Sequence, residues 1–228
     1  MLIRFNILSL LALALTVSFT LSLASCSSDD EDTTSEYYNW KSRNDAYFEK
    51  IFQQATDEIN SGSEDWYKIM SYSKNDASNH CNYIIVHVLS QSKEVHKEVV
   101  DGSKNTSNGL VCPIDKDSCT VTYRGNMMPS ASYTTIAPPD NIEVGYQFDT
   151  KWYGNDLNIE EATFTKFVPG SGVVEGFGTA LQYMHPGDRW RVYIPYRLGY
   201  GSSSNGSVQA YSTLIFDVYL KSFKTKQK

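Results

Sequence analysis

Cysteine and histidine are scarce in this sequence, and neither is spaced for metal binding. The 228-residue chain has four cysteines and four histidines, with no Cys-x-x-Cys and with each histidine isolated, which argues against a metal centre. A basic excess is also lacking, because the formal net charge is -6, and a nucleic-acid-binding surface needs clustered positive charge. The sequence therefore predicts no cofactor, no metal and no nucleic-acid partner.

The first 25 residues show the pattern of a secretory signal. Arg4 supplies a positive start, an apolar stretch runs from Ile7 to Leu23, and the small residues Ala24 and Ser25 follow. A membrane-spanning helix is the alternative, but the run is short for a span of about 20 residues and no basic stop-transfer cluster follows it. We therefore predict that residues 1–25 are a signal peptide, outside the fold.

The end of this signal resembles a bacterial lipobox, Leu23-Ala24-Ser25-Cys26. The resemblance implies lipidation of Cys26 and an anchor in the outer membrane, on its periplasmic face or at the cell surface; several acyl chains would hold the chain stably. An ordinary signal followed by a chance cysteine is the alternative. Residues 26–37 continue as an acidic tether, and Asp29-Asp30-Glu31-Asp32 resembles the export signal of surface lipoproteins in Bacteroidetes.

Residues 38–100 are predicted to form an N-terminal extension with one helix and one strand. From Trp40 to Ile59 the apolar residues recur at helical spacing, which indicates an amphipathic helix. Tyr83 to Leu89 form an apolar, β-branched run typical of a strand. A lone helix must bury its apolar face, so the helix packs on its own domain or forms a dimer.

Residues 101–228 carry mainly the alternating pattern of short strands. Trp190, Val192 and Ile194 share one face of such a segment, and Leu214 to Leu220 alternate in the same way. A short helical pattern around Phe177 lies between the predicted strands. The fold class predicted is α+β, an antiparallel sheet packed on one short helix, with the N-terminal helical extension attached.

Several segments of this region resemble FKBP-type peptidyl-prolyl cis-trans isomerases. Val173-Val174-Glu175-Gly176-Phe177 begins a stretch similar to that family's "V-I-x-G-W-x-x-A-L-x-x-M-x-x-G", and Ile194-Pro195-Tyr196-Arg197-Leu198-Gly199-Tyr200-Gly201 looks like "I-P-x-x-L-A-Y-G". Thr213 to Leu220 match the closing "T-L-x-F-x-V-x-L" strand, and Val121 to Gly125 match "V-x-Y-x-G". The resemblance covers about residues 110–222 and implies an FKBP-like domain.

The resemblance also implies a pocket that binds proline-containing polypeptides and catalyses X-Pro isomerisation. The positions that match its lining are Tyr123, Phe148, Asp149, Val173, Val174, Phe177, Tyr200, Val208 and Phe216. Phe164 or Phe167 would supply a further aromatic wall. The barrier to rotation is about 20 kcal/mol, and an apolar aromatic site suits a twisted amide that has lost part of its charge separation.

Three departures from the family pattern bear on that function. Phe177 stands where a Trp is usual, and Val208-Gln209-Ala210 replaces an "I-P-P" run, which predicts a looser loop. A long insertion between Tyr123 and Phe148 contains Pro138 and Pro139, and we expect it near the pocket rim. The chain is thus an isomerase for envelope or surface proteins or a non-catalytic chaperone or protein-binding module. A surface protein that binds a polymer or host ligand is a third alternative.

The cysteines that follow Cys26 are Cys81, Cys112 and Cys119. An exported protein meets an oxidising environment, and the odd number leaves at least one of the three outside any bridge among them. Cys112 and Cys119 are close in sequence with a turn signal between them, so they are the favoured disulfide. A bridge from Cys81 to either is the alternative.

Overall fold

A computed structural model describes residues 35–91 and 112–225 of the chain. The predicted signal peptide, Cys26 and most of the acidic tether lie outside these residues, so those predictions stay predictions. The predicted boundary near residue 100 also lies outside them. Among the described residues, no helix has both the length and the apolar composition needed to cross a bilayer.

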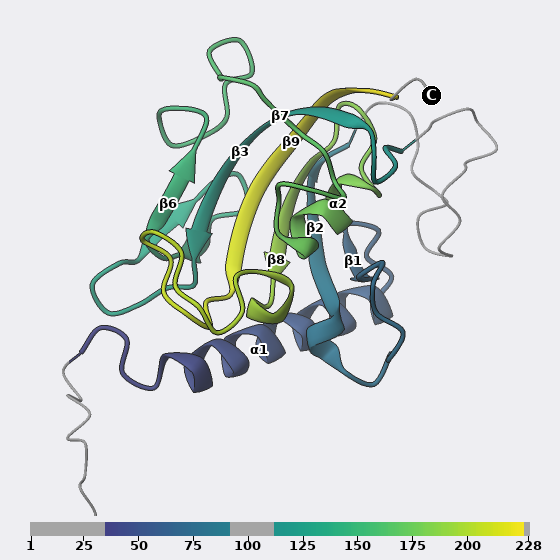
Figure 1. The fold of residues 1–228 in the computed structure, drawn as a ribbon. Coiled ribbons are helices and arrows are strands. Elements are labelled where there is room, and N and C mark those ends of the chain that lie inside the picture. Colours follow the sequence, from purple (N-terminus) through teal and green to yellow (C-terminus); the bar gives the residue numbers. More distant parts are fainter. Residues whose placement is uncertain (1–34, 92–111, 226–228) are drawn as a thin grey trace, which may run out of the picture. The chain divides into compact units, whose positions relative to one another are not determined.

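The fold is built on one seven-stranded sheet in which every pair of neighbours is antiparallel. Its strand order is β1-β2-β8-β9-β3-β6, with β7 also paired to β3. The long strands β3 and β9 run side by side through it (Figure 1). The strands are β1 Trp66–Met70, β2 Tyr83–Ser90, β3 Ser118–Met127, β6 Gln147–Thr150, β7 Thr165–Phe167, β8 Arg189–Ile194 and β9 Leu214–Lys224.

The predicted extension and the predicted isomerase-like domain share this sheet. Strand β2, which lies in the extension, pairs along its length with β8, and β1 is added at the outer edge of β2. The region 38–100 therefore contributes two strands to the sheet of the C-terminal region, in addition to its helix.

One face of the sheet packs on the short helix α2, Glu175–Leu181, as the alternation of the strands predicts. Trp190, Val192 and Ile194 of β8 point to this face and are 0–1% exposed. Gly176 lets the helix approach closely, because a Cβ there would lie 2.4 Å from Ile194 Cγ2. This face forms the larger apolar core and carries the candidate site.

The opposite face of the sheet packs on the long helix α1, Trp40–Asn60. The apolar stripe of α1 meets side chains that alternate with those of the first core, such as Ile85, Tyr193 and Ile215. The residues that α1 contributes to this second cluster are Phe48, Ile51, Phe52 and Ala55. The apolar stripe of α1 therefore packs on its own domain, which is one of the two predicted alternatives. A dimer formed through α1 could not use this apolar surface, because the sheet already covers it.

The insertion after β3 lies on this second face, so the expectation that it sits at the pocket rim is wrong for its proline-containing part. It forms a hairpin of β4 (Thr135–Ala137) and β5 (Ile142–Val144). Ala137 and Val144 pack in the cluster beneath α1, and the Pro138 carbonyl accepts a hydrogen bond from Arg191 Nη2 at 2.9 Å. Burial against α1 holds the hairpin here, which the sequence did not reveal.

Buried charges accompany this second face. Arg191 of β8 and Asp217 of β9 are 2% and 3% exposed. Arg189 Nε donates to Asp217 Oδ1 at 2.9 Å, and Arg191 Nη2 donates to Asp140 Oδ1 at 2.6 Å. Because each of these buried charges has an opposite charge beside it, the penalty for leaving water is offset in part.

The predicted Cys112–Cys119 disulfide is wrong, and no bridge joins Cys81, Cys112 and Cys119. Cys119 is fully buried in the apolar core, while the Cys112 thiol lies 3.4 Å from His185 Nε2. Burial raises the pKa of the Cys119 thiol to about 12. The turn between the two cysteines exists, but it does not bring their sulfur atoms together.

Candidate functional site

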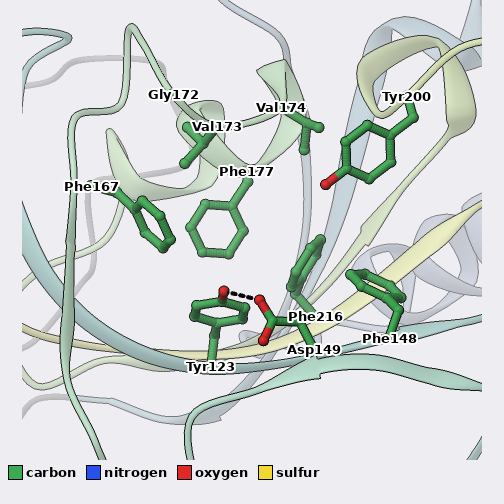
Figure 2. A pocket seen from close by; sticks show the side chains of 10 residues that line it. All are labelled: Tyr123, Phe148, Asp149, Phe167, Gly172, Val173, Val174, Phe177, Tyr200 and Phe216. Carbon is green, nitrogen blue, oxygen red and sulfur yellow. Dashed lines mark hydrogen bonds between the residues drawn. The ribbon is translucent and has the colours of Figure 1, made fainter. Parts of the chain in front are cut away.

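A cavity of about 180 Å³ opens on the α2 face of the sheet. Figure 2 shows aromatic side chains from four elements converging on it: Tyr123 from β3, Phe148 from β6, Phe167 from β7 and Phe177 from α2. The rest of its lining is Asp149, Gly172, Val173, Val174, Tyr200 and Phe216. The floor is a cluster of edge-to-face rings, with the Phe177 centroid 4.9 Å from that of Phe216.

Gly125 of β3 makes room for two of these rings. A Cβ at this position would lie 2.6 Å from the Phe148 ring and 2.8 Å from the Phe216 ring, closer than non-bonded carbon atoms approach one another in proteins. The side chains of Phe148 and Phe216 meet over it with centroids 5.6 Å apart and planes at 87°. The glycine of the "V-x-Y-x-G" segment therefore has a steric reason, which is to admit the aromatic walls.

The carboxylate of Asp149 on the cavity wall is held by two neighbouring side chains, Tyr123 and Lys151. The Tyr123 hydroxyl donates a hydrogen bond to Asp149 Oδ2, drawn as the dashed line in Figure 2. Lys151 Nζ lies 3.5 Å from the other carboxylate oxygen and 5.5 Å from the centroid of the Tyr123 ring. Burial and the hydrogen bond to Asp149 raise the pKa of Tyr123. Its hydroxyl therefore stays protonated and keeps the carboxylate oriented.

Tyr200 supplies the second hydroxyl of the site. It follows the 3-10 helix η3, Tyr196–Leu198, and its hydroxyl points into the cavity (Figure 2). Burial, with the charge of Asp149 as a second cause, raises the pKa of Tyr200. A protonated phenol can donate to a carbonyl oxygen of a bound chain. Besides the Tyr123 hydroxyl that donates to Asp149, the cavity thus offers apolar walls, the Tyr200 hydroxyl and one carboxylate at the edge.

Eight of the nine residues predicted for the pocket line this one cavity. The exception is Val208, which is 4% exposed in the core and pairs its backbone with Asn205. Phe167, and not Phe164, forms the further aromatic wall; Phe164 packs instead against Tyr219. The lining also includes Gly172, which no motif in the sequence indicated; its positive φ of 79° marks the turn that leads into Val173.

The described residues contain no cluster of three or more His, Cys, Asp or Glu side chains suited to a metal ion. A site of this kind binds by shape, apolar contact and a small number of hydrogen bonds. The fold and the site together define a small binding domain with an apolar aromatic pocket on one face of an antiparallel sheet.

Comparison with known proteins assigns that domain to a family. The model of the FKBP-type peptidyl-prolyl cis-trans isomerase family matches residues 112–221. This chain therefore contains a domain of the FKBP-type peptidyl-prolyl cis-trans isomerase family. The match spans the strands and helix that supply the pocket, from β3 to β9.

Two curated relatives are similar to parts of the chain. A "Macrophage infectivity potentiator" from Trypanosoma cruzi is 46% identical over 70 residues, which cover 30% of this chain and 35% of that protein. The "FKBP-type peptidyl-prolyl cis-trans isomerase FkpA" of Aeromonas hydrophila is 28% identical over 120 residues, covering 53% of this chain and 40% of the relative. The chain thus spans less than half the length of these relatives.

Among solved structures, a peptidyl-prolyl cis-trans isomerase from Pseudomonas syringae pv. tomato aligns with 80% of this chain and 96% of its own. The sequence identity is 17% and the TM-score is 0.46.

Proposed function

We propose that this chain catalyses cis-trans isomerisation of X-Pro bonds in polypeptides. The observation that carries the proposal is the single cavity that gathers Tyr123, Phe148, Asp149, Phe177 and Phe216 in a domain of this family. Rotation about an amide passes through a twisted state without resonance, and the barrier is about 20 kcal/mol. An apolar site stabilises that less polar state relative to the planar amide.

Each part of the cavity has a role in this scheme. The rings of Phe148, Phe177 and Phe216 contact the proline ring and exclude water. The Tyr200 hydroxyl donates to a substrate carbonyl and fixes its pose, while Asp149, oriented by Tyr123, forms a polar contact at the edge. No nucleophile takes part, because no covalent bond is made or broken.

The direct test is turnover of an X-Pro peptide by the full-length chain in detergent. We expect a rate above the uncatalysed background that is inhibited by a macrolide ligand of the pocket. A folded protein without such a rate would contradict the proposal.

A non-catalytic protein-binding module is the alternative, and the Phe177 floor favours it. Phe177 packs edge-to-face against Tyr123, Phe167 and Phe216, with centroids 4.9–5.8 Å away. The Phe177 ring is smaller than the Trp that is usual at this position in the family pattern. If this difference limits the site, Phe177→Trp raises turnover or tightens macrolide binding. A folded Trp variant as silent as an inactive wild type would leave the binding module as the function.

We also propose that the chain acts at the cell envelope, on exported proteins, and is held there by a lipid on Cys26. The apolar run that ends in Leu-Ala-Ser-Cys supports this proposal. Replacing Cys26 by Ala would move the protein from the membrane fraction to the soluble fraction. Unchanged membrane partitioning, with no acyl mass on the chain, would overturn it.

A further inference from the structure

The loop between η3 and β9 joins two residues of the cavity, Tyr200 and Phe216. It lacks the two prolines that the family pattern has at Gln209 and Ala210. Without them, the loop has more backbone freedom to lose when it is ordered. Other contacts must therefore hold it in place.

The base of the loop is closed by its own backbone. Tyr211 N donates to Gly201 O at 2.9 Å, next to Tyr200, and Val208 exchanges two 2.9 Å hydrogen bonds with Asn205. Tyr211 has a φ of 63°, a left-handed conformation that a bulky residue adopts only when its surroundings enforce it. Its ring packs edge-to-face against Tyr196 with centroids 5.3 Å apart, and side chains of the N-terminal helix hold the next two residues of the loop.

Asn44 of α1 makes the central contact. Its Oδ1 accepts a hydrogen bond of 2.6 Å from Thr213 N, where the loop enters β9, and its Nδ2 donates to the Trp40 carbonyl at 2.7 Å. The side chain is 0% exposed. A backbone amide buried at this point would otherwise lack a partner from the sheet, so the bond is costly to remove.

Neighbours of Asn44 on the same helix add to this contact. Trp40 Nε1 donates to Ser212 Oγ at 2.9 Å, and that hydroxyl donates to the Gln209 carbonyl at 2.7 Å. Lys41 Nζ lies 6.0 Å from the centroid of the Tyr211 ring. The first turns of α1 therefore hold the loop from Gln209 to Thr213 at several points.

We propose that Asn44 is a positioning residue for the cavity, which replaces the missing prolines by fixing the loop that carries Tyr200. The proposal rests on the proposed function for its effect on turnover. It assigns a role in the site to a helix outside residues 112–221, the part of the chain that matches the family. Loss of Asn44 leaves the loop to be ordered when substrate binds, which weakens binding.

The experiment compares Asn44→Ala with Phe52→Ala in the full-length chain. Phe52 lies farther along the same helix, is 8% exposed, and stacks on His80 with centroids 3.7 Å apart. Asn44→Ala should raise KM for an X-Pro peptide about fivefold with little change in kcat, whereas Phe52→Ala should lower the Tm but leave KM within about twofold. Trp40→Phe, which removes one hydrogen bond and keeps a ring, should give a smaller rise in KM.

Hydrogen exchange separates this proposal from the proposed function. Asn44→Ala should speed exchange of the Val208 and Tyr211 amides relative to Phe52→Ala, whether or not the protein turns over substrate. A wild type without isomerase activity would refute the proposed function. The hydrogen-exchange rates of the two amides would then decide by themselves whether Asn44 fixes the loop. Equal exchange at these amides in the two variants, or a KM that follows Tm in both, would overturn the role of Asn44.

Discussion

The two faces of the central sheet are both buried, but they are buried by different chemistry. On the α2 face, apolar and aromatic side chains surround a cavity whose one carboxylate lies at its edge. On the α1 face, apolar contacts share the space with Arg189, Arg191, Asp140 and Asp217. Both faces of one strand take part, since Phe216 lines the cavity while Asp217 pairs with two arginines.

The two kinds of burial suit two different tasks, binding of a substrate on the α2 face and attachment of the insertion on the α1 face. An aromatic wall accepts an uncharged ring without paying for the removal of charges from water, so the α2 face suits a proline. Paired charges are directional and tolerate little displacement, so they suit the attachment of the insertion to the sheet. The substitutions below test whether the two faces differ in this way.

The largest effect is expected on the α1 face, from Asp217→Ala. The change leaves Arg189 and Arg191 without their shared carboxylate at a buried position, and the free energy of unfolding should fall by about 3–5 kcal/mol. Urea denaturation measures it. Asp156→Ala is the matched control, since it also pairs with Arg189 at 2.6 Å but is 50% exposed, and it should cost about 0–1 kcal/mol. Equal costs would remove the distinction between buried and exposed pairs.

On the α2 face, Gly125→Ala should act mainly on the cavity. The added methyl group collides with Phe148 and Phe216, so the rings must shift at a cost of about 1–3 kcal/mol in stability. Macrolide affinity and turnover should both fall more steeply than the stability loss implies. A folded variant with unchanged affinity would show that the rings move aside freely.

Tyr200→Phe tests the Tyr200 hydroxyl, which points into the cavity, whereas the Tyr123 hydroxyl donates to Asp149. Its loss should cost about 0.5–1.5 kcal/mol, a several-fold decrease in kcat/KM, without a matching loss of stability. Because burial and Asp149 raise the pKa of Tyr200, the hydroxyl stays protonated, and the wild-type rate should not fall as the pH rises to about 9. A rate that declines between neutral pH and about pH 9 would mean that a group other than Tyr200 loses a proton in this range and controls the rate.

The smallest effect is expected from Glu175→Gln at the start of α2. Burial would raise the pKa of Glu175, but hydrogen bonds from Ser71 and Ser73 and the charge of Lys74 bring it below its usual value. A lowered pKa stabilises the fold above the unfolded value of 4.5 and loses that contribution as the pH falls through the folded value. The variant should lose about 0.5 kcal/mol at neutral pH and show a shallower acid limb in its Tm profile. An unchanged acid limb would show that this carboxylate contributes nothing.

Local pattern carried most of the fold prediction. The helix at Trp40–Asn60, the strand at Tyr83–Ser90 and the strands around Val192 and Phe216 all follow from periodicity. The family resemblance placed eight residues of one cavity, because motif spacing follows strand pairing in a shared fold. The disulfide prediction failed because closeness in sequence does not fix where two thiols lie. Cys119 is buried within β3, whereas Cys112 lies before the turn, beside His185.

The sequence by itself determined both α-helices, the strands around Val86, Val192 and Phe216 and most of the residues that meet in the cavity, because these depend on local periodicity and on motifs of fixed spacing. Only the tertiary structure decided what covers the second face. The burial of Arg191, the position of the hairpin with Ala137, and the bond from Thr213 to Asn44 all join segments distant in sequence. Such contacts depend on how α1 and the insertion pack on the sheet. Polar residues that alternate along a strand give the same sequence pattern whether that face of the strand meets water or lies beneath a helix.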